Sequence, residues 1–254
     1  MIYEVHRKTK NNIGDYWCNP SRYFDFGEIQ SGELLHNRFP IKDQSILIGG
    51  GGLIHKKFSD HIQRLLDKGP ATSIIWGIGH NFSKKHESKS LQPYYPKWLD
   101  RVSLVGIRDW IDGHYNSYLP CVSCMHPAFD KTYKVTNDIV YYTHAFKSKY
   151  QYKQGDAWMK NDEKDFDKVI EFLGSANTIV TDSYHGAYWG QLLGKDIRVL
   201  SWSVKFDHMK YPPSYLSHIT KWKESSPSYA SKDFLNESRN LNKQFYNKVL
   251  KLIS

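Results

Sequence analysis

Apolar residues and glycines in the first half of the chain predict a strand, a helix and a second strand in succession. Residues 45–48 form a short apolar run of the buried-strand type, and residues 49–52 are four glycines. Ser59 is the expected N-cap of a helix that reaches residue 68, where a Gly-Pro pair ends it. Residues 72–77 return to an apolar run. This strand–helix–strand order predicts a parallel sheet.

The second half of the chain repeats this order. Apolar runs predict three strands, and two periodic segments between them predict helices, the first of which we expect Asp162 to cap. In chain order these elements are a strand at 138–142, a helix that follows Asp162 and stops at Gly174, a strand at 178–181, a turn at 182–186, a short helix to Leu193 and a strand at 197–201.

The end of the chain has the pattern of one long amphipathic helix. Apolar side chains recur there at steps of three and four, at Phe234, Leu241, Phe245, Val249 and Leu252. The predicted fold class is therefore α/β, with two Rossmann-like lobes of parallel strands. The lobes span residues 1–125 and 126–230, and the helix at 231–254 packs back on the body. Ligands of such lobes are expected outside the carboxyl ends of the strands, in the cleft between them.

Composition supports a folded chain that binds anions. The apolar fraction of 40% and the aromatic fraction of 15% are too high for disorder. No run approaches the roughly 20 apolar residues of a membrane span, and no signal-peptide core follows Met1, so we expect a cytoplasmic protein. The formal net charge is +9, but the basic residues are scattered, which disfavours nucleic acid as a partner. Peripheral contact with an anionic membrane stays open.

The cysteines predict neither disulfides nor a metal site. There are three, Cys18, Cys121 and Cys124, an odd number in a chain without an export signal. Cys121, Cys124 and His126 follow one another closely, but a structural zinc site normally needs four ligands at recognisable spacings. We therefore expect ordinary thiols and no metal.

Two glycine-containing segments are candidate ligand contacts. Gly49, Gly50, Gly51 and Gly52 follow a strand, where their backbone N–H groups could approach a phosphate without a Cβ in the way. The alternative is a tight turn without a ligand. The segment from Asn12 to Asp15 has the composition of a simple Asx turn, and by itself it indicates little.

Two side chains at predicted strand ends are candidates for chemistry. His185 follows the strand at 178–181, beside Asp182 and Ser183, where an imidazole can transfer protons. A purely structural histidine is the alternative. Arg108 follows a predicted strand at 102–105, where its guanidinium can bind a carboxylate or phosphate.

The surroundings of Arg108 leave a second interpretation open. A surface salt bridge from Arg108 to Asp109 or Asp112 would need no ligand. Asp109 is also placed to open a short helix.

Several short motifs occur here in the order found in polysaccharide pyruvyl transferases, a family that the chain resembles over roughly residues 11–210. The most specific is Thr181-Asp182-Ser183-Tyr184-His185-Gly186. The others are the segment from Asn12 to Asp15, the glycines at 49–52 with Leu53-Ile54, Gly77-Ile78-Gly79, Val105-Gly106-Ile107-Arg108-Asp109 and Lys205-Phe206.

This resemblance implies a fold similar to type B glycosyltransferases, with phosphoenolpyruvate as co-substrate and no other cofactor. It implies that His185 is the general acid, with Arg108 and Asp182 as further catalytic residues. Some members carry arginine where this chain has Ser183. Arg108, Lys205 and the glycine amides are therefore expected to hold the anionic groups of the donor. The implied substrate-binding residues are Asn12, Asp15, Gly49, Gly50, Gly51, Gly52, Gly79, Ser183, Gly186 and Lys205.

The expected function is transfer of a pyruvyl group from phosphoenolpyruvate to a pair of hydroxyls on a sugar or glycan, with a lipid-linked acceptor left open. Asp15 and Asp182 both stay candidates for orienting the imidazole or accepting a hydroxyl proton. A nucleotide-sugar glycosyltransferase is the alternative, because the same architecture serves sugar transfer.

Overall fold

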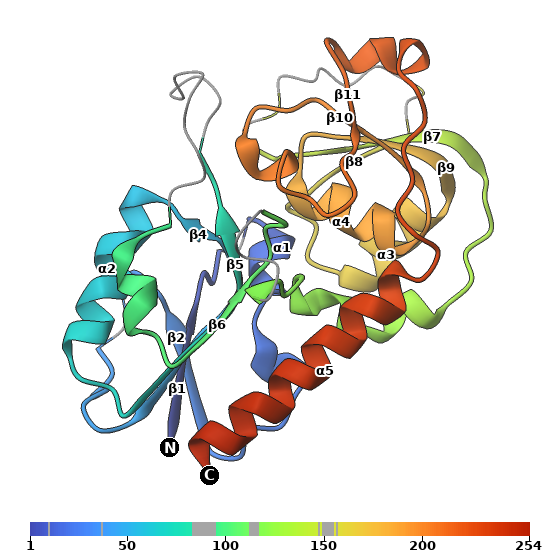
Figure 1. Cartoon of the computed structure of the whole chain (residues 1–254). Coiled ribbons are helices and arrows are strands. Elements are labelled where there is room, and N and C mark those ends of the chain that lie inside the picture. Colours follow the sequence, from blue (N-terminus) through green and yellow to red (C-terminus); the bar gives the residue numbers. More distant parts are fainter. Residues whose placement is uncertain are drawn as a thin grey trace. The chain divides into compact units, whose positions relative to one another are not determined.

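The computed structural model describes residues 1–9, 11–36, 38–82, 95–111, 117–146, 148, 155 and 157–254, apart from the side chain at position 219 (Figure 1). The chain forms two compact units. The first comprises Met1–Lys8, Asp15–Ser123 and Ser238–Ser254, and the second Thr9–Gly14 and Cys124–Glu237. Each has its own parallel sheet, so the predicted α/β class with two Rossmann-like lobes is confirmed.

The first unit contains a sheet in which every described strand pair is parallel. Its strand order is β2-β1-β3-β5-β4, and β6 pairs with β5. The strands are β1 (Ile2–His6), β2 (Ile29–Glu33), β3 (Ser45–Ile48), β4 (Gly51–Ile54), β5 (Thr72–His80) and β6 (Leu104–Ile107). Sequence analysis had not predicted β1, β2 or β4.

The glycine run differs from its prediction. Gly51 and Gly52 begin strand β4, so the run connects two strands rather than a strand and a helix. The helix that follows, α2 (Lys56–Asp67), begins four residues before the start expected from a cap at Ser59. His55 caps it, because its Nδ1 accepts a hydrogen bond from Lys57 N (3.2 Å). Ser59 was a wrong choice of N-cap, since its N–H already donates to the His55 carbonyl within the helix (3.0 Å).

Helices cover both faces of the first sheet. Successive residues of a strand point to opposite faces, and Ile75 and Trp76 of β5 show this. Ile75 belongs to the core that contains Ile62 of α2, whereas Trp76 contacts Phe245 of the C-terminal helix, with ring centroids 4.8 Å apart. That helix, α5 (Phe234–Ile253), therefore covers the face opposite α2 (Figure 1).

The second unit contains a sheet of order β11-β10-β9-β7-β8, again with parallel described pairs. Its strands are β7 (Asn137–Thr143), β8 (Trp158–Lys160), β9 (Ala176–Thr181), β10 (Asp196–Val199) and β11 (Ser214–Tyr215). Its helices include α1 (Ile13–Tyr16), which begins there, α3 (Phe166–Gly174) and α4 (Tyr184–Leu192). The expected cap Asp162 was wrong, because Asp165 caps α3 by accepting a hydrogen bond from Lys168 N (3.2 Å).

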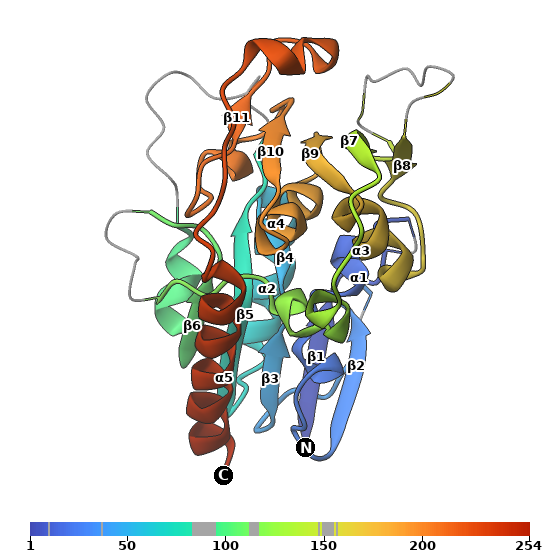
Figure 2. The same ribbon diagram turned by 90° about the vertical axis from the view of Figure 1, so that its right-hand side faces the viewer.

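Glycines allow α4 to lie directly on this second sheet. A Cβ on Gly190 would come within 2.4 Å of Ile197 Cδ1 of β10 and 2.7 Å of Ile179 Cδ1 of β9. Helices α3 and α4 lie side by side on this face (Figure 2), where the rings of Phe166 and Trp189 are 4.9 Å apart. The carboxyl end of β9 and the start of α4 are thereby held together.

The C-terminal helix has a more polar buried stripe than its sequence predicts. Phe234, Phe245 and Val249 are buried as expected, but Leu241 is only partly buried and Leu252 is 43% exposed. The buried positions between them are Ser238 and Asn242. Among the described residues, no helix combines the length and apolar character needed to cross a bilayer.

Candidate functional site

The turn from β9 into α4 holds the Thr181 to Gly186 motif in the second unit. The Thr181 hydroxyl organises this turn, because it donates to the Tyr142 carbonyl (2.5 Å) and accepts from Ser183 N (2.9 Å). Ser183 occupies the N-cap position of α4, and its own side chain makes no capping hydrogen bond. The motif therefore sets the start of α4 and places His185 in its first turn.

The His185 imidazole lies against the backbone of Gly14. A Cβ on Gly14 would come within 1.9 Å of His185 Nδ1, so only glycine leaves room for the ring in this position. The ring also packs against Trp189, with centroids 5.1 Å apart, and against the edge of Tyr184 at 5.5 Å. His185 is 5% exposed. Two predicted motifs that are far apart in sequence thus meet within the second unit.

An Asx turn holds Gly14 in this place. The Asn12 side-chain oxygen accepts from Gly14 N (3.2 Å), and also from the Asn161 amide (3.2 Å). The Asn161 carbonyl accepts from Ile13 N (2.9 Å), and its side-chain oxygen accepts from Ala145 N (2.8 Å). Asn12 therefore positions the segment that His185 contacts, and Asn161 anchors it.

Asp182 is a buried carboxyl group in the same turn. Its Oδ1 accepts from His144 N (2.6 Å), and its backbone carbonyl accepts from the indole of Trp202 (2.9 Å). Burial raises the pKa of Asp182, while hydrogen bonds from His144 N and Ser148 and the charge of Lys205 oppose the rise. A carboxyl group with a raised pKa is a stronger base than usual once it ionises.

The remaining predicted residues of the second unit lie nearby but differ in environment. Lys205 is 6% exposed, with its Nζ 4.0 Å from the centroid of the Trp202 ring. Gly186 is needed for packing, because a Cβ there would come within 2.5 Å of Tyr142 Cδ1. Packing alone therefore requires glycine at position 186, whether or not a substrate binds there.

In the first unit, the predicted residues Gly79 and Arg108 pack together at the carboxyl ends of β5 and β6. Arg108 N donates to the Ile78 carbonyl (2.8 Å), and a Cβ on Gly79 would come within 2.7 Å of Arg108 Nε and 2.5 Å of Asp109 Oδ1. Arg108 is 3% exposed. Glycine at position 79 is therefore required by the close passage of these two side chains.

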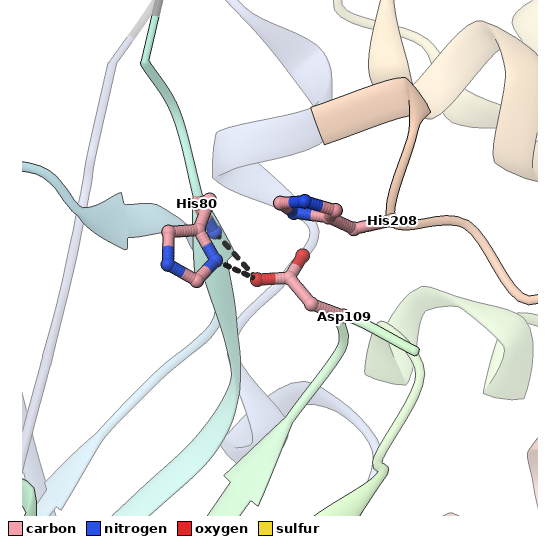
Figure 3. Close-up of side chains that lie close together, drawn as sticks. All are labelled: His80, Asp109 and His208. Atoms are coloured by element: carbon pink, nitrogen blue, oxygen red, sulfur yellow. Dashed lines mark hydrogen bonds and ion pairs between the residues drawn. The ribbon is translucent and has the colours of Figure 1, made fainter. Parts of the chain in front are cut away.

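Asp109 forms a buried pair with His80 (Figure 3). Asp109 Oδ2 lies 2.7 Å from His80 Nδ1 and accepts from His80 N at 2.7 Å, and each side chain is 1% exposed. Residues 110 and 111 are not helical, and the rest of the short helix that Asp109 was expected to open lies outside the described residues. Asp112 lies outside the described residues. His208, also drawn in Figure 3, belongs to the second unit.

His80 has an aromatic neighbour, and two buried thiols are affected by the charge of Arg108. Tyr95 packs edge-on against His80, with centroids 5.0 Å apart, and its pKa is raised by burial and by the charge of Asp109. Burial also raises the pKa of the Cys18 and Cys121 thiols, and the positive charge of Arg108 opposes the rise in both. None of the three cysteines forms a disulfide with another described residue, and all three are buried.

Two of the four glycine amides are not available for the expected phosphate cradle. Gly49 N donates to the Val5 carbonyl (2.9 Å), and Gly50 N donates to the Cys18 carbonyl (3.1 Å). Because each amide has one hydrogen to donate, the expectation was wrong for these two residues. Asp15 lies beside the run, since its Oδ1 would be 3.7 Å from a Cβ on Gly51.

Sequence reasoning missed His80 and Asn161. His80 directly follows the Gly77-Ile78-Gly79 motif and ends β5, so its position after an apolar run was a usable signal. Asn161 follows the three-residue strand β8, which the sequence analysis did not predict. Its contacts with Asn12 and Ala145 depend on chain segments that no local pattern links.

Comparisons with known proteins inform the fold alone. No family model matches the chain, and no curated protein matches it significantly. Among solved structures, the chain is similar to an uncharacterized protein from Klebsiella pneumoniae subsp. pneumoniae, at 16% identity and a TM-score of 0.53. The match covers 85% of this chain and 93% of the other. This similarity supports the two-lobed α/β fold.

Proposed function

We propose that this protein transfers a pyruvyl group from phosphoenolpyruvate to two hydroxyls of a sugar, with His185 as the general acid. One observation carries the proposal: the imidazole of the Thr181 to Gly186 motif lies on Gly14, the glycine of the Asn12 to Asp15 motif. Both motifs belong to the resemblance, and their contact within one unit is what a shared role would require.

The proposed chemistry needs a proton donor near neutral pH. The methylene carbon of phosphoenolpyruvate takes a proton from the imidazolium of His185, which leaves a cationic centre at the adjacent carbon. One sugar hydroxyl adds to that centre, phosphate leaves with the electron pair of its C–O bond, and the second hydroxyl completes the ketal. Both hydroxyl protons pass to bases or solvent, so His185 is reprotonated for the next turnover.

The surroundings of His185 suggest the other roles in the second unit. Asp182 is our candidate for accepting a hydroxyl proton, because burial raises the pKa of its carboxyl group. Lys205 is the candidate cation for the donor, since it belongs to the same unit and its charge acts on Asp182. Arg108 and Asp15 remain expected contacts from the motif resemblance.

The direct test is phosphate release from phosphoenolpyruvate in the presence of a panel of glycosides. We expect His185→Ala to lower turnover roughly 100-fold or more, because general acid catalysis typically contributes that much. Phosphoenolpyruvate should still bind, and the wild-type rate should fall as pH rises and the imidazolium is lost. His36→Ala is the matched control, because His36 is exposed in the first unit. Near-wild-type turnover in folded His185→Ala protein would refute the assignment.

Ligand protection against thermal unfolding separates this proposal from the glycosyltransferase alternative. A ligand stabilises the folded state in proportion to the logarithm of its concentration over its dissociation constant. We expect phosphoenolpyruvate to raise Tm. Protection by a sugar nucleotide, without any by phosphoenolpyruvate, would replace the proposed donor.

A further inference from the structure

The first unit has a cavity that none of the predicted site residues lines. Its volume is about 550 Å³, within the range of small-molecule sites, and it lies beside the start of α2. Its lining residues come from the end of β4, the first two turns of α2, the residues just after β5 and the segment around Trp98. They are Ile54, His55, Lys56, Ser59, Asp60, Gln63, Phe82, Pro96, Lys97, Trp98 and Arg101.

Aromatic rings form one part of this cavity wall. His55 and Phe82 lie with ring centroids 5.6 Å apart and planes inclined by 31°. Trp98 is 5% exposed, and its indole N–H is buried with no hydrogen-bond acceptor among the described residues. A buried donor without an acceptor is costly, so a ligand oxygen at this wall would relieve the cost. Flat rings of this kind suit the apolar face of a sugar.

Positive charge dominates the cavity rim. Lys56 and Lys97 are exposed, and neither forms an ion pair or side-chain hydrogen bond with another described residue. Arg101 pairs with Asp67 outside the cavity (2.8 Å), and Asp60 is the acidic side chain in the lining. The amino-terminal end of α2 adds a partial positive charge. The rim therefore favours a ligand with an anionic group.

Polar side chains of α2 supply hydrogen bonds for hydroxyl groups. Ser59, Asp60 and Gln63 occupy positions within about one turn and line the cavity together. None of their side chains forms a hydrogen bond with another described residue. A hydroxyl, a carboxylate and an amide next to aromatic rings provide the mixture of donors and acceptors that a sugar needs.

We propose that this cavity binds a sugar that carries a carboxylate or phosphate group. The rings take the apolar face of the sugar, the α2 side chains take its hydroxyls, and Lys56 and Lys97 hold the anion. The binding assignment stands on the cavity alone. That the bound sugar is the pyruvyl acceptor rests on the proposed function.

Calorimetric titration of the full chain with glucuronate and with a hexose phosphate tests the binding assignment. Glucose and inorganic phosphate are the controls for the sugar and the anion alone. We expect at least one charged sugar to bind more tightly than either control and to weaken as salt is added. The Lys56→Gln and Lys97→Gln double variant should bind it about fivefold more weakly, as expected for the loss of two exposed ion pairs. Lys57→Gln is the matched control, because Lys57 is exposed on the same helix but does not line the cavity.

The aromatic wall has its own test. Trp98→Phe keeps a ring and removes the indole N–H, and Phe82→Leu removes the half-buried ring at the rim. Both should weaken binding in protein whose far-ultraviolet circular dichroism is unchanged. The proposal would be overturned if glucuronate, the hexose phosphate and glucose bound with equal affinity. It would also be overturned if uridine monophosphate bound as tightly as the hexose phosphate, or if Lys57→Gln lowered the affinity fivefold. Because no phosphoenolpyruvate is present, these outcomes are independent of pyruvyl transfer.

Discussion

Replacing Gly14 by alanine tests the contact on which the proposed site depends. The added Cβ would lie 1.9 Å from His185 Nδ1 and 2.4 Å from its Cγ, whereas ordinary contacts begin near 3.4 Å. The ring would therefore have to move by about 1.5 Å, away from a position in which Trp189 and Tyr184 pack against it. Overpacking of this kind typically costs about 1–3 kcal/mol of unfolding free energy.

A double-mutant cycle separates this clash from other effects of the substitution. Alanine is intrinsically better than glycine inside a helix by up to about 1 kcal/mol, and Gly14 lies in α1. In the His185→Ala background the obstructing ring is gone, so Gly14→Ala should be neutral or slightly stabilising there. We therefore expect a coupling free energy of about 1–3 kcal/mol between the two positions.

Urea denaturation of the four proteins, followed by circular dichroism, measures the coupling. The midpoints give the unfolding free energies as long as the dependence on urea concentration is unchanged. If Gly14→Ala destabilised both backgrounds equally, the imidazole would not lie on Gly14, and the observation supporting the proposed function would be lost.

Two further predictions concern the first unit. Asn242 accepts a hydrogen bond from the Trp76 indole (2.8 Å) and donates one to the Pro120 carbonyl (3.2 Å). Asn242→Ala should therefore cost about 2–3 kcal/mol of unfolding free energy, whereas Asn247→Ala on the exposed side of α5 should cost little. Equal urea midpoints for the two variants would contradict this prediction. Burial lowers the pKa of His6 to about 4 from 6.5, so the unfolded chain takes up a proton before the folded one does. The stability that neutral His6 contributes should be fully present above about pH 6.5 and lost as pH falls towards about 4. In the His6→Gln variant the urea midpoint should therefore depend less on pH in that interval. A pH dependence equal to that of the wild type would contradict the lowered pKa of His6.

Sequence patterns were sufficient where a strand or helix is recognisable from its own residues. The apolar runs at β3, β5, β7 and β9 predicted buried strands, and their alternation with helices predicted parallel sheets. The same patterns could not predict β1, because Glu4 and His6 of that strand look solvent-exposed in sequence. Both are buried, and Glu4 accepts hydrogen bonds from the Ser21 and Ser31 hydroxyls, which come from later segments.

The candidate site likewise has features that local sequence predicted and features that only the tertiary structure showed. The Thr181 to Gly186 motif and its strand-to-helix turn were recognisable locally, and so was the Asx turn at Asn12. Only the tertiary structure decided that Gly14 supports His185, that Asp109 pairs with His80, and that the Gly49 and Gly50 amides donate to backbone carbonyls. The physical reason is that a strand or a turn is stabilised largely by neighbours in sequence. The partner of a buried polar group is instead whichever donor or acceptor the folded chain brings within about 3 Å of it.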